Sequence, residues 1–173
     1  QRGIGTSVNG SGAFGASINI LTDNISQDPF FESNNTLGSY NTYKNTFRFS
    51  TGLLNDVFEF SGRLSKIDSD GYIDRASSDL KSYFLQASYK KNNTLIKILN
   101  FGGHEITYQA WNGIDLQTLE NDRLYNPSGL YFDLEGNSQF HENEVDNYKQ
   151  DHFQFHWTQS MNKNLTSNLG LNL

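Results

Sequence analysis

The stretch that decides the fold is DHFQFHWTQSM, residues 151–161. Its apolar side chains recur at every second position, namely Phe153, Phe155, Trp157 and Met161, and polar side chains fill the positions between them. Successive side chains of a β-strand point to opposite faces. The pattern therefore predicts a strand with one apolar face and one polar face.

The same period of two extends through most of the chain from about residue 37 onward. It predicts further strands over residues 43–53, 57–67, 80–91, 94–107 and 165–173. The alternation is poorest in the segment 94–107. With about six or seven strands and no segment of helical period, the sequence predicts an all-β fold.

The connections between these strands alternate in length. Tight turns follow Leu54, Lys91 and Met161, whereas long polar segments occupy residues 68–79 and 108–147. Short turns on one side and long loops on the other are typical of outer-membrane β-barrels. Alternation alone does not separate a barrel from a soluble sandwich, because both have one apolar and one polar face per strand.

Composition excludes several classes of protein. The formal net charge of -6 argues against a nucleic-acid partner, which requires a basic surface. The absence of cysteine excludes disulfides and thiol chemistry. No stretch approaches the roughly 20 apolar residues of a spanning helix, so a membrane crossing would have to use strands. No signal peptide is visible, and we expect the true N-terminus to lie upstream.

The first 36 residues differ from the rest. Residues 1–16 are rich in glycine, residues 17–22 predict a short strand, and the polar residues 23–36 predict a linker broken by Asp28-Pro29. The segment 10–15 matches the dinucleotide pattern G-x-G-x-x-G, but a strand follows it where that motif requires a helix. We interpret these glycines as a tight backbone passage.

Three segments carry a resemblance to a known family. Residues 2–7 (Arg-Gly-Ile-Gly-Thr-Ser) and 9–20, which end in Ile-Asn-Ile, resemble the C-terminal end of the plug domain of TonB-dependent outer-membrane receptors. Residues 69–75 (Ser-Asp-Gly-Tyr-Ile-Asp-Arg) and 101–113 resemble the first barrel strands of such receptors, particularly those of Bacteroidetes-type bacteria. The resemblance divides the chain into the end of a plug, residues 1–30, and barrel strands with their loops, residues 31–173.

The resemblance implies a fold and a function. Receptors of this family have a 22-stranded antiparallel barrel with a plugged lumen, so the chain would be a fragment of a multi-pass barrel in the bacterial outer membrane. It implies active uptake of a scarce nutrient, which we expect to be a ferric siderophore or similar iron chelate, with oligosaccharide or cobalamin as alternatives within the family. The TonB energising complex would engage an upstream segment. Outer-membrane lipid would surround the barrel, and a surface lipoprotein partner is left open.

No catalytic or metal site is expected. The segment 68–74 resembles a calcium loop but lacks the ligand spacing and the distal glutamate of an EF-hand. His152 and His156 would lie about 13 Å apart on a strand and could not chelate one ion together. Hydrolase, metalloprotease and nucleotide-binding motifs are absent. The sequence therefore predicts a protein that is not an enzyme and has no cofactor.

We expect substrate contacts from the long loop and from the plug. Tyr108 and Trp111 lie just beyond a strand end and His141 lies later in the same loop, while Arg2 and Asn9 belong to the plug resemblance. Further residues are expected to have a structural role where the plug meets the barrel wall. These are Arg48, Glu59 and Arg63.

Two alternatives stay open. A soluble β-sandwich module could recognise carbohydrate through Trp111 and its neighbours. It requires the aromatic residues of two strands to pack into a closed core, namely Phe47, Phe49, Phe153, Phe155 and Trp157. A barrel with a structural or assembly role, which borrows the receptor fold without a substrate, would show the same strands.

Overall fold

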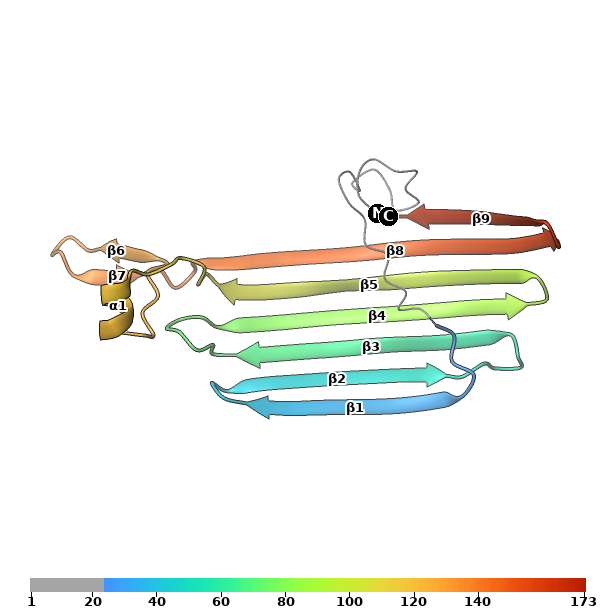
Figure 1. Cartoon of the computed structure of the whole chain (residues 1–173), viewed down its shortest axis with the longest axis horizontal. Helices are drawn as coiled ribbons and strands as arrows, with labels where there is room; N and C mark the ends of the chain where they lie inside the picture. Colours follow the sequence, from blue (N-terminus) through green and yellow to red (C-terminus); the bar gives the residue numbers. More distant parts are fainter. Residues whose placement is uncertain (1–23) are drawn as a thin grey trace.

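The computed structural model describes residues 24–173, which form an all-β protein (Figure 1). Seven strands make one antiparallel sheet in the order β1-β2-β3-β4-β5-β8-β9, so each strand pairs with the next of the sheet along the chain. The strands are β1 Pro29–Gly38, β2 Thr42–Thr51, β3 Phe58–Ser69, β4 Ser78–Lys91, β5 Thr94–Tyr108, β8 Val145–Asn162 and β9 Leu165–Asn172. The short strand expected over residues 17–22 and the glycine-rich segment before it lie outside the described residues.

Six strands confirm the prediction from alternation, including the uncertain β5, which pairs along its whole length with β4 and β8. The strand β8 begins at Val145, six residues before the alternating stretch. Its first residues are polar and mostly exposed, yet they stay paired with β5 up to the Tyr108–Val145 pair. Hydrogen bonding of the backbone thus extends the strand beyond the part that its side-chain pattern marks.

The linker predicted over residues 23–36 is wrong from residue 29 onward. Residues Pro29–Gly38 form β1, which pairs with the whole of β2. Pro29 is the first residue of this strand, a position where proline is tolerated because no internal pairing needs its N–H. The connecting turn uses positive φ angles at Tyr40 and Asn41, and the weak alternation of the strand left it without a sequence signal.

The segment expected as a long loop after β5 is a folded insertion. It contains the one-turn helix α1 (Leu116–Asn121) and a hairpin of two short strands, β6 (Leu130–Phe132) and β7 (Ser138–Phe140). Figure 1 shows these elements beyond one end of the sheet, next to the connection between β3 and β4. The tight turns after β2, β4 and β8 lie at the opposite end. The short turn between β1 and β2 is the exception, because it lies at the end with the long connections.

The register places the apolar side chains of neighbouring strands beside one another on one side of the sheet, which we call the apolar face. One such row, with each member directly opposite the next, is Phe60, Ala87, Ile98, Phe155 and Leu171. The other side, the polar face, carries mainly serine, glutamine, histidine and charged side chains. Each strand therefore separates its two kinds of side chain in the way the alternation predicts.

Burial on the two faces is the reverse of that in a water-soluble domain. Among residues 24–173 the buried side chains are mostly polar, and Leu99 and Tyr108 are the only buried large hydrophobic ones. On the apolar face Phe153 is 43% exposed and Leu171 is 55% exposed. No second layer covers this face in the described part of the chain, because the remaining sheet is the small hairpin β6–β7 at the loop end. No helix within residues 24–173 is long and apolar enough to cross a membrane.

Candidate functional site

A hollow of about 790 Å³ lies on the polar face of β2, β3 and β4. Arg48, Glu59 and Arg63 line it, together with serine and threonine side chains of the same strands. Arg48 also forms an ion pair with Glu32 of β1, with 2.9 Å between Nη1 and Oε2. The three residues expected where the plug meets the barrel wall therefore lie together on the polar face. That a plug packs against them stays a prediction.

Glu59 is fully buried at the wall of this hollow. Its carboxylate accepts hydrogen bonds from Ser50 Oγ at 2.8 Å and from Gln86 Nε2 at 3.3 Å. The backbone N–H of Ser26 donates to the same carboxylate at 3.5 Å and so ties the segment before β1 to the wall. A buried carboxylate requires such donors, because burial without hydrogen bonds is costly. Sequence alternation assigns Glu59 to the correct face and gives no signal that it is buried.

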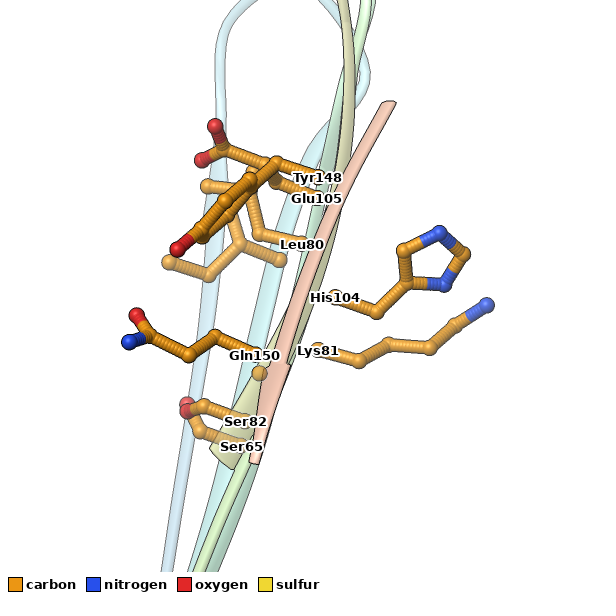
Figure 2. Close-up of a pocket in the computed structure, with 10 residues that line it drawn as sticks. Ser65, Leu80, Lys81, Ser82, His104, Glu105, Tyr148 and Gln150 are labelled. Atoms are coloured by element: carbon orange, nitrogen blue, oxygen red, sulfur yellow. The ribbon is translucent and has the colours of Figure 1, made fainter. Parts of the chain in front are cut away.

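A second hollow, of about 350 Å³, lies nearer the loop end of the sheet (Figure 2). Glu105, Tyr148 and Gln150 project from the polar face of the sheet, and Ser65 and Ser82 lie below them on the same face in this view. These groups supply a carboxylate, a phenol, an amide and two hydroxyls, and Ile67 and Leu80 add an apolar part to the lining. Such a set can hydrogen-bond a polar solute that moves along the face, and it contains no arrangement suited to covalent catalysis.

The loops beyond the sheet are joined around Asn126, which is fully buried. Its Nδ2 donates to the backbone oxygens of Asp74 and Gln109, each at 3.0 Å, and its Oδ1 accepts from the N–H of Ser128 at 3.1 Å. One side chain thus connects the β3–β4 loop, the start of the insertion and the turn before β6. Residues 126–129 were expected only as part of a loop, and the central role of Asn126 was missed.

Arg75 of the β3–β4 loop adds a second connection. Its guanidinium donates to the backbone oxygen of Asn126 and lies 3.5 Å from the ring centroid of Phe140. Its position in the sequence, after Asp74 in a polar loop, carries no signal for this contact, because Phe140 is 65 residues away. We call Arg75, Tyr108, Asn126, Ser128 and Phe140 the loop cluster.

The residues expected to contact substrate differ in exposure. Tyr108 is buried in the loop cluster, where its hydroxyl donates to the backbone oxygen of His141 at 2.7 Å. Trp111 is 74% exposed. The ring of His141 stacks on Tyr131 with 4.4 Å between centroids. Trp111 and His141 are thus accessible at the loop end, whereas Tyr108 holds the loops together. Arg2 and Asn9 lie outside the described residues.

The resemblance of residues 68–74 to a calcium loop gains no support from the structure. Within residues 24–173 no three histidine, cysteine, aspartate or glutamate side chains are grouped so as to hold a metal ion. In the segment that resembles a calcium loop, Asp70 accepts a hydrogen bond from Asn41 Nδ2 at 2.6 Å. This contact fixes the β3–β4 loop against the β1–β2 turn.

Asp133 organises the turn between β6 and β7. Its carboxylate accepts from the backbone N–H groups of Asn137 and Glu135, and these bonds, the one to Asn137 first, hold the pKa of Asp133 below its usual value. A lowered folded-state pKa means that the contribution to turn stability is present above the unfolded pKa of about 3.9 and is lost as pH falls through the folded pKa.

We therefore expect Asp133→Ala to increase backbone amide exchange over residues 135–140 at neutral pH, because the turn loses four hydrogen bonds that Glu135, Asn137 and Gln139 donate to this carboxylate. Asp133→Asn keeps an acceptor oxygen and should have a smaller effect. The measurement is hydrogen–deuterium exchange of the full-length protein, with Glu142→Gln as the control at another exposed carboxylate of the insertion. Equal exchange in Asp133→Ala and the control would contradict this role.

No protein-family profile, curated protein or solved structure matches the chain.

Proposed function

We propose that this chain is part of the wall and outer loops of a TonB-dependent uptake receptor in the bacterial outer membrane. One observation carries the proposal: the apolar face is uncovered and the polar face holds the buried carboxylate and the hollows. In an outer-membrane barrel the apolar face meets lipid and the polar face meets a wet or plugged interior.

The exposure of the apolar face supports an apolar medium against it. Soluble monomers rarely expose a contiguous apolar patch beyond a few hundred Å², and here the exposed large side chains continue across β2, β3, β4, β5, β8 and β9. They include Phe47, Phe58, Phe60, Leu64, Leu85, Ile98, Phe153, Leu169 and Leu171. At about 25 cal/mol per Å², leaving this surface in water would cost more free energy than a small domain has to spare. Hydrocarbon removes that cost.

The apolar band ends nearer the loop end on β2 than on β8. On β2 its uninterrupted part ends at Phe47, and the register carries the row of Phe47 through Leu64 and Tyr83 to Asp151 on β8. On β8 the band ends at Phe153, two residues further from the loops. Tyr43 and Ile106 are isolated apolar residues beyond this edge.

The loop end then faces the outside of the cell. The loop cluster fixes the folded insertion beyond the end of the sheet, and the exposed Trp111 and His141 border this cluster. A substrate that arrives there would pass to the polar face, where Tyr148, Glu105 and Gln150 line the hollow of about 350 Å³. We propose that the cargo is a ferric siderophore or similar iron chelate, that the TonB complex supplies the energy through an upstream segment, and that the chain has no enzymatic activity.

The soluble-sandwich alternative has no support within residues 24–173. It requires the aromatic residues of β2 and β8 to be sealed against a second sheet, and no second sheet covers them in the described part of the chain.

Two measurements on the full-length protein test the proposal. Cell membranes are washed with alkaline carbonate and then extracted with detergent, and the protein should be released only by the detergent. Uptake of radioactive iron as a panel of ferric chelates is compared in cells with and without the protein, and a protonophore should abolish the difference. Release by carbonate alone would refute membrane insertion. Insertion without energised uptake of iron chelates, oligosaccharides or cobalamin would refute the receptor role and favour a structural barrel.

A further inference from the structure

Three lysines and a histidine are aligned in one row on the apolar face, just beyond the apolar band. Lys66 of β3, Lys81 of β4, His104 of β5 and Lys149 of β8 are directly opposite one another in successive register pairs. Figure 2 shows Lys81 and His104 leaving the sheet side by side, away from the residues of the polar face. We call these four residues the cationic row.

Such a row is unfavourable in isolation, because like charges directly opposite one another destabilise a sheet. Aspartates on the same strands reduce the repulsion: Lys66 Nζ lies 3.0 Å from Asp68, Lys81 Nζ lies 3.3 Å from Asp79, and Lys149 Nζ lies 3.7 Å from Asp151. These ion pairs are exposed, and pairs of that kind contribute little. The lysines therefore remain available to an additional anion.

A hollow of about 470 Å³ joins the cationic row to the apolar band. Phe47, Leu64 and Tyr83 line its lower part, and the lysines and His104 line its upper part. A Cβ at Gly102 would lie 2.5 Å from Asp151 Oδ1 and 3.0 Å from Tyr83 Cε1, so the glycine lets these two side chains approach each other.

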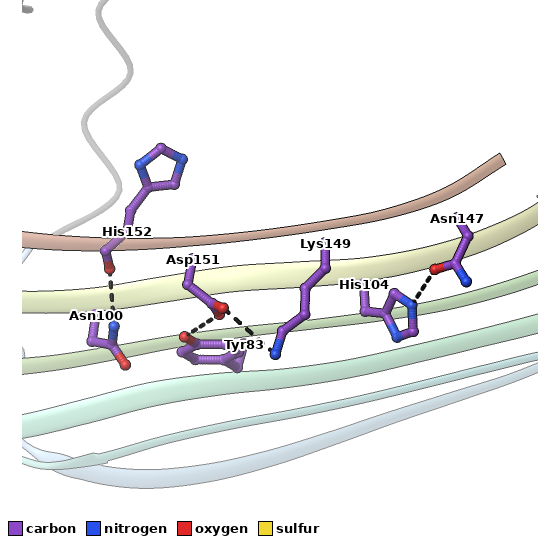
Figure 3. A network of polar contacts seen from close by, with 7 residues as sticks. All are labelled: Tyr83, Asn100, His104, Asn147, Lys149, Asp151 and His152. Atoms are coloured by element: carbon purple, nitrogen blue, oxygen red, sulfur yellow. Dashed lines mark hydrogen bonds and ion pairs between the residues drawn. The ribbon is translucent and has the colours of Figure 1, made fainter. Parts of the chain in front are cut away.

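The polar groups at the rim of this hollow are held by one another (Figure 3). Tyr83 donates to Asp151 at 2.8 Å, Lys149 pairs with the same carboxylate, and a ring nitrogen of His104 lies 2.7 Å from Asn147 Oδ1. The rim is thus ordered before any ligand arrives.

We propose that this hollow binds the phosphate-bearing headgroup of an anionic lipid, with the phosphate against the cationic row and an acyl chain against Phe47 and Leu64. The inference rests on the proposed membrane location and goes beyond the uptake role. The occupant follows from the position of the site: a cation row at the edge of a lipid-facing band meets headgroups, and lysines near a membrane surface attract anionic ones. The phosphate would also remove the repulsion between Lys66 and Lys81.

The test uses the full-length protein in nanodiscs that contain phosphatidic acid and phosphatidylcholine in equal amounts. Native mass spectrometry of the released protein gives the ratio of the two lipids that stay bound. The wild type should retain phosphatidic acid preferentially, and K66Q/K81Q/K149Q should reduce that preference by about ten-fold or more. The control K44Q/K90Q/R123Q removes three charges from the polar face and the insertion and should keep the wild-type ratio. D68N/D79N should increase the preference.

Each outcome bears on the proposal. Loss of the preference in the row variant alone, with a gain in D68N/D79N, supports the site. An unchanged ratio in the row variant, or an equal loss in the control, overturns it. A wild type that enters nanodiscs without any preference overturns the lipid site and leaves the receptor proposal standing, whereas a wild type that does not enter nanodiscs overturns both.

Discussion

Phe155→Lys is expected to destabilise the folded protein in a bilayer by about 2–4 kcal/mol, the cost of a lysine near the middle of the membrane. Phe155 lies on the apolar face of β8, between Ile98 of β5 and Leu171 of β9. Both neighbours are apolar, so the ammonium group would have no partner within reach along the row. The measurement is urea-dependent unfolding of the full-length protein from lipid vesicles.

His156→Lys is the matched control, because it places the same charge one residue further along the same strand. His156 belongs to the polar face, where a ring nitrogen lies 3.1 Å from Gln154 Oε1. We expect a change well below that of Phe155→Lys, since the new ammonium group would meet polar neighbours. Equal losses at the two positions would contradict the assignment of the faces.

Asn126→Leu is expected to open the loop cluster, at a cost of about 3 kcal/mol or more. The substitution removes the partners of three backbone groups, the oxygens of Asp74 and Gln109 and the N–H of Ser128. Each buried polar group left without a partner costs about 1–3 kcal/mol. The strands of the main sheet should stay paired, because none of these groups belongs to their interior.

Limited proteolysis of the full-length protein in lipid vesicles measures this opening. We expect new cleavage sites within residues 70–77 and 109–144 and an unchanged pattern in the strands. Asn121→Leu, at the exposed end of α1, is the matched control and should cleave as the wild type does. Protection of both loops in Asn126→Leu would contradict the role of Asn126.

The parts of the fold that sequence analysis predicted are those where burial differs between the two faces of a strand. On β8 the alternation of Phe153, Phe155 and Trp157 with polar residues marks the strand and its faces directly. On β1 the positions on the apolar face include the polar residues Ser33 and Asn35. The alternation of apolar and polar side chains is therefore lost, although the pairing with β2 is complete. Pairing depends on backbone groups that every residue except proline carries, and side-chain patterns do not report it.

The candidate site was predictable only in outline. The aromatic stretch after β5 correctly drew attention to the loop end, but Tyr108 is buried there and Trp111 is exposed. The contacts of Asn126 and Arg75 bring together residues separated by 17 to 65 positions, and no local pattern encodes such contacts. The cationic row is equally hidden in sequence, because its four members come from four strands and become neighbours only through the register.

The central claim concerns the medium that touches the phenylalanine-rich side of β8. Residues 152–158 contain no cysteine, so single cysteines can be introduced at each position of the full-length protein in a lipid bilayer and labelled with a nitroxide. Electron paramagnetic resonance then measures collisions with oxygen, which concentrates in lipid, and with a water-soluble nickel chelate. Our account predicts oxygen accessibility at positions 153, 155 and 157 that alternates with lower values at 152, 154, 156 and 158. Nickel access at 153, 155 and 157, or exclusion of both reagents from them, would contradict it.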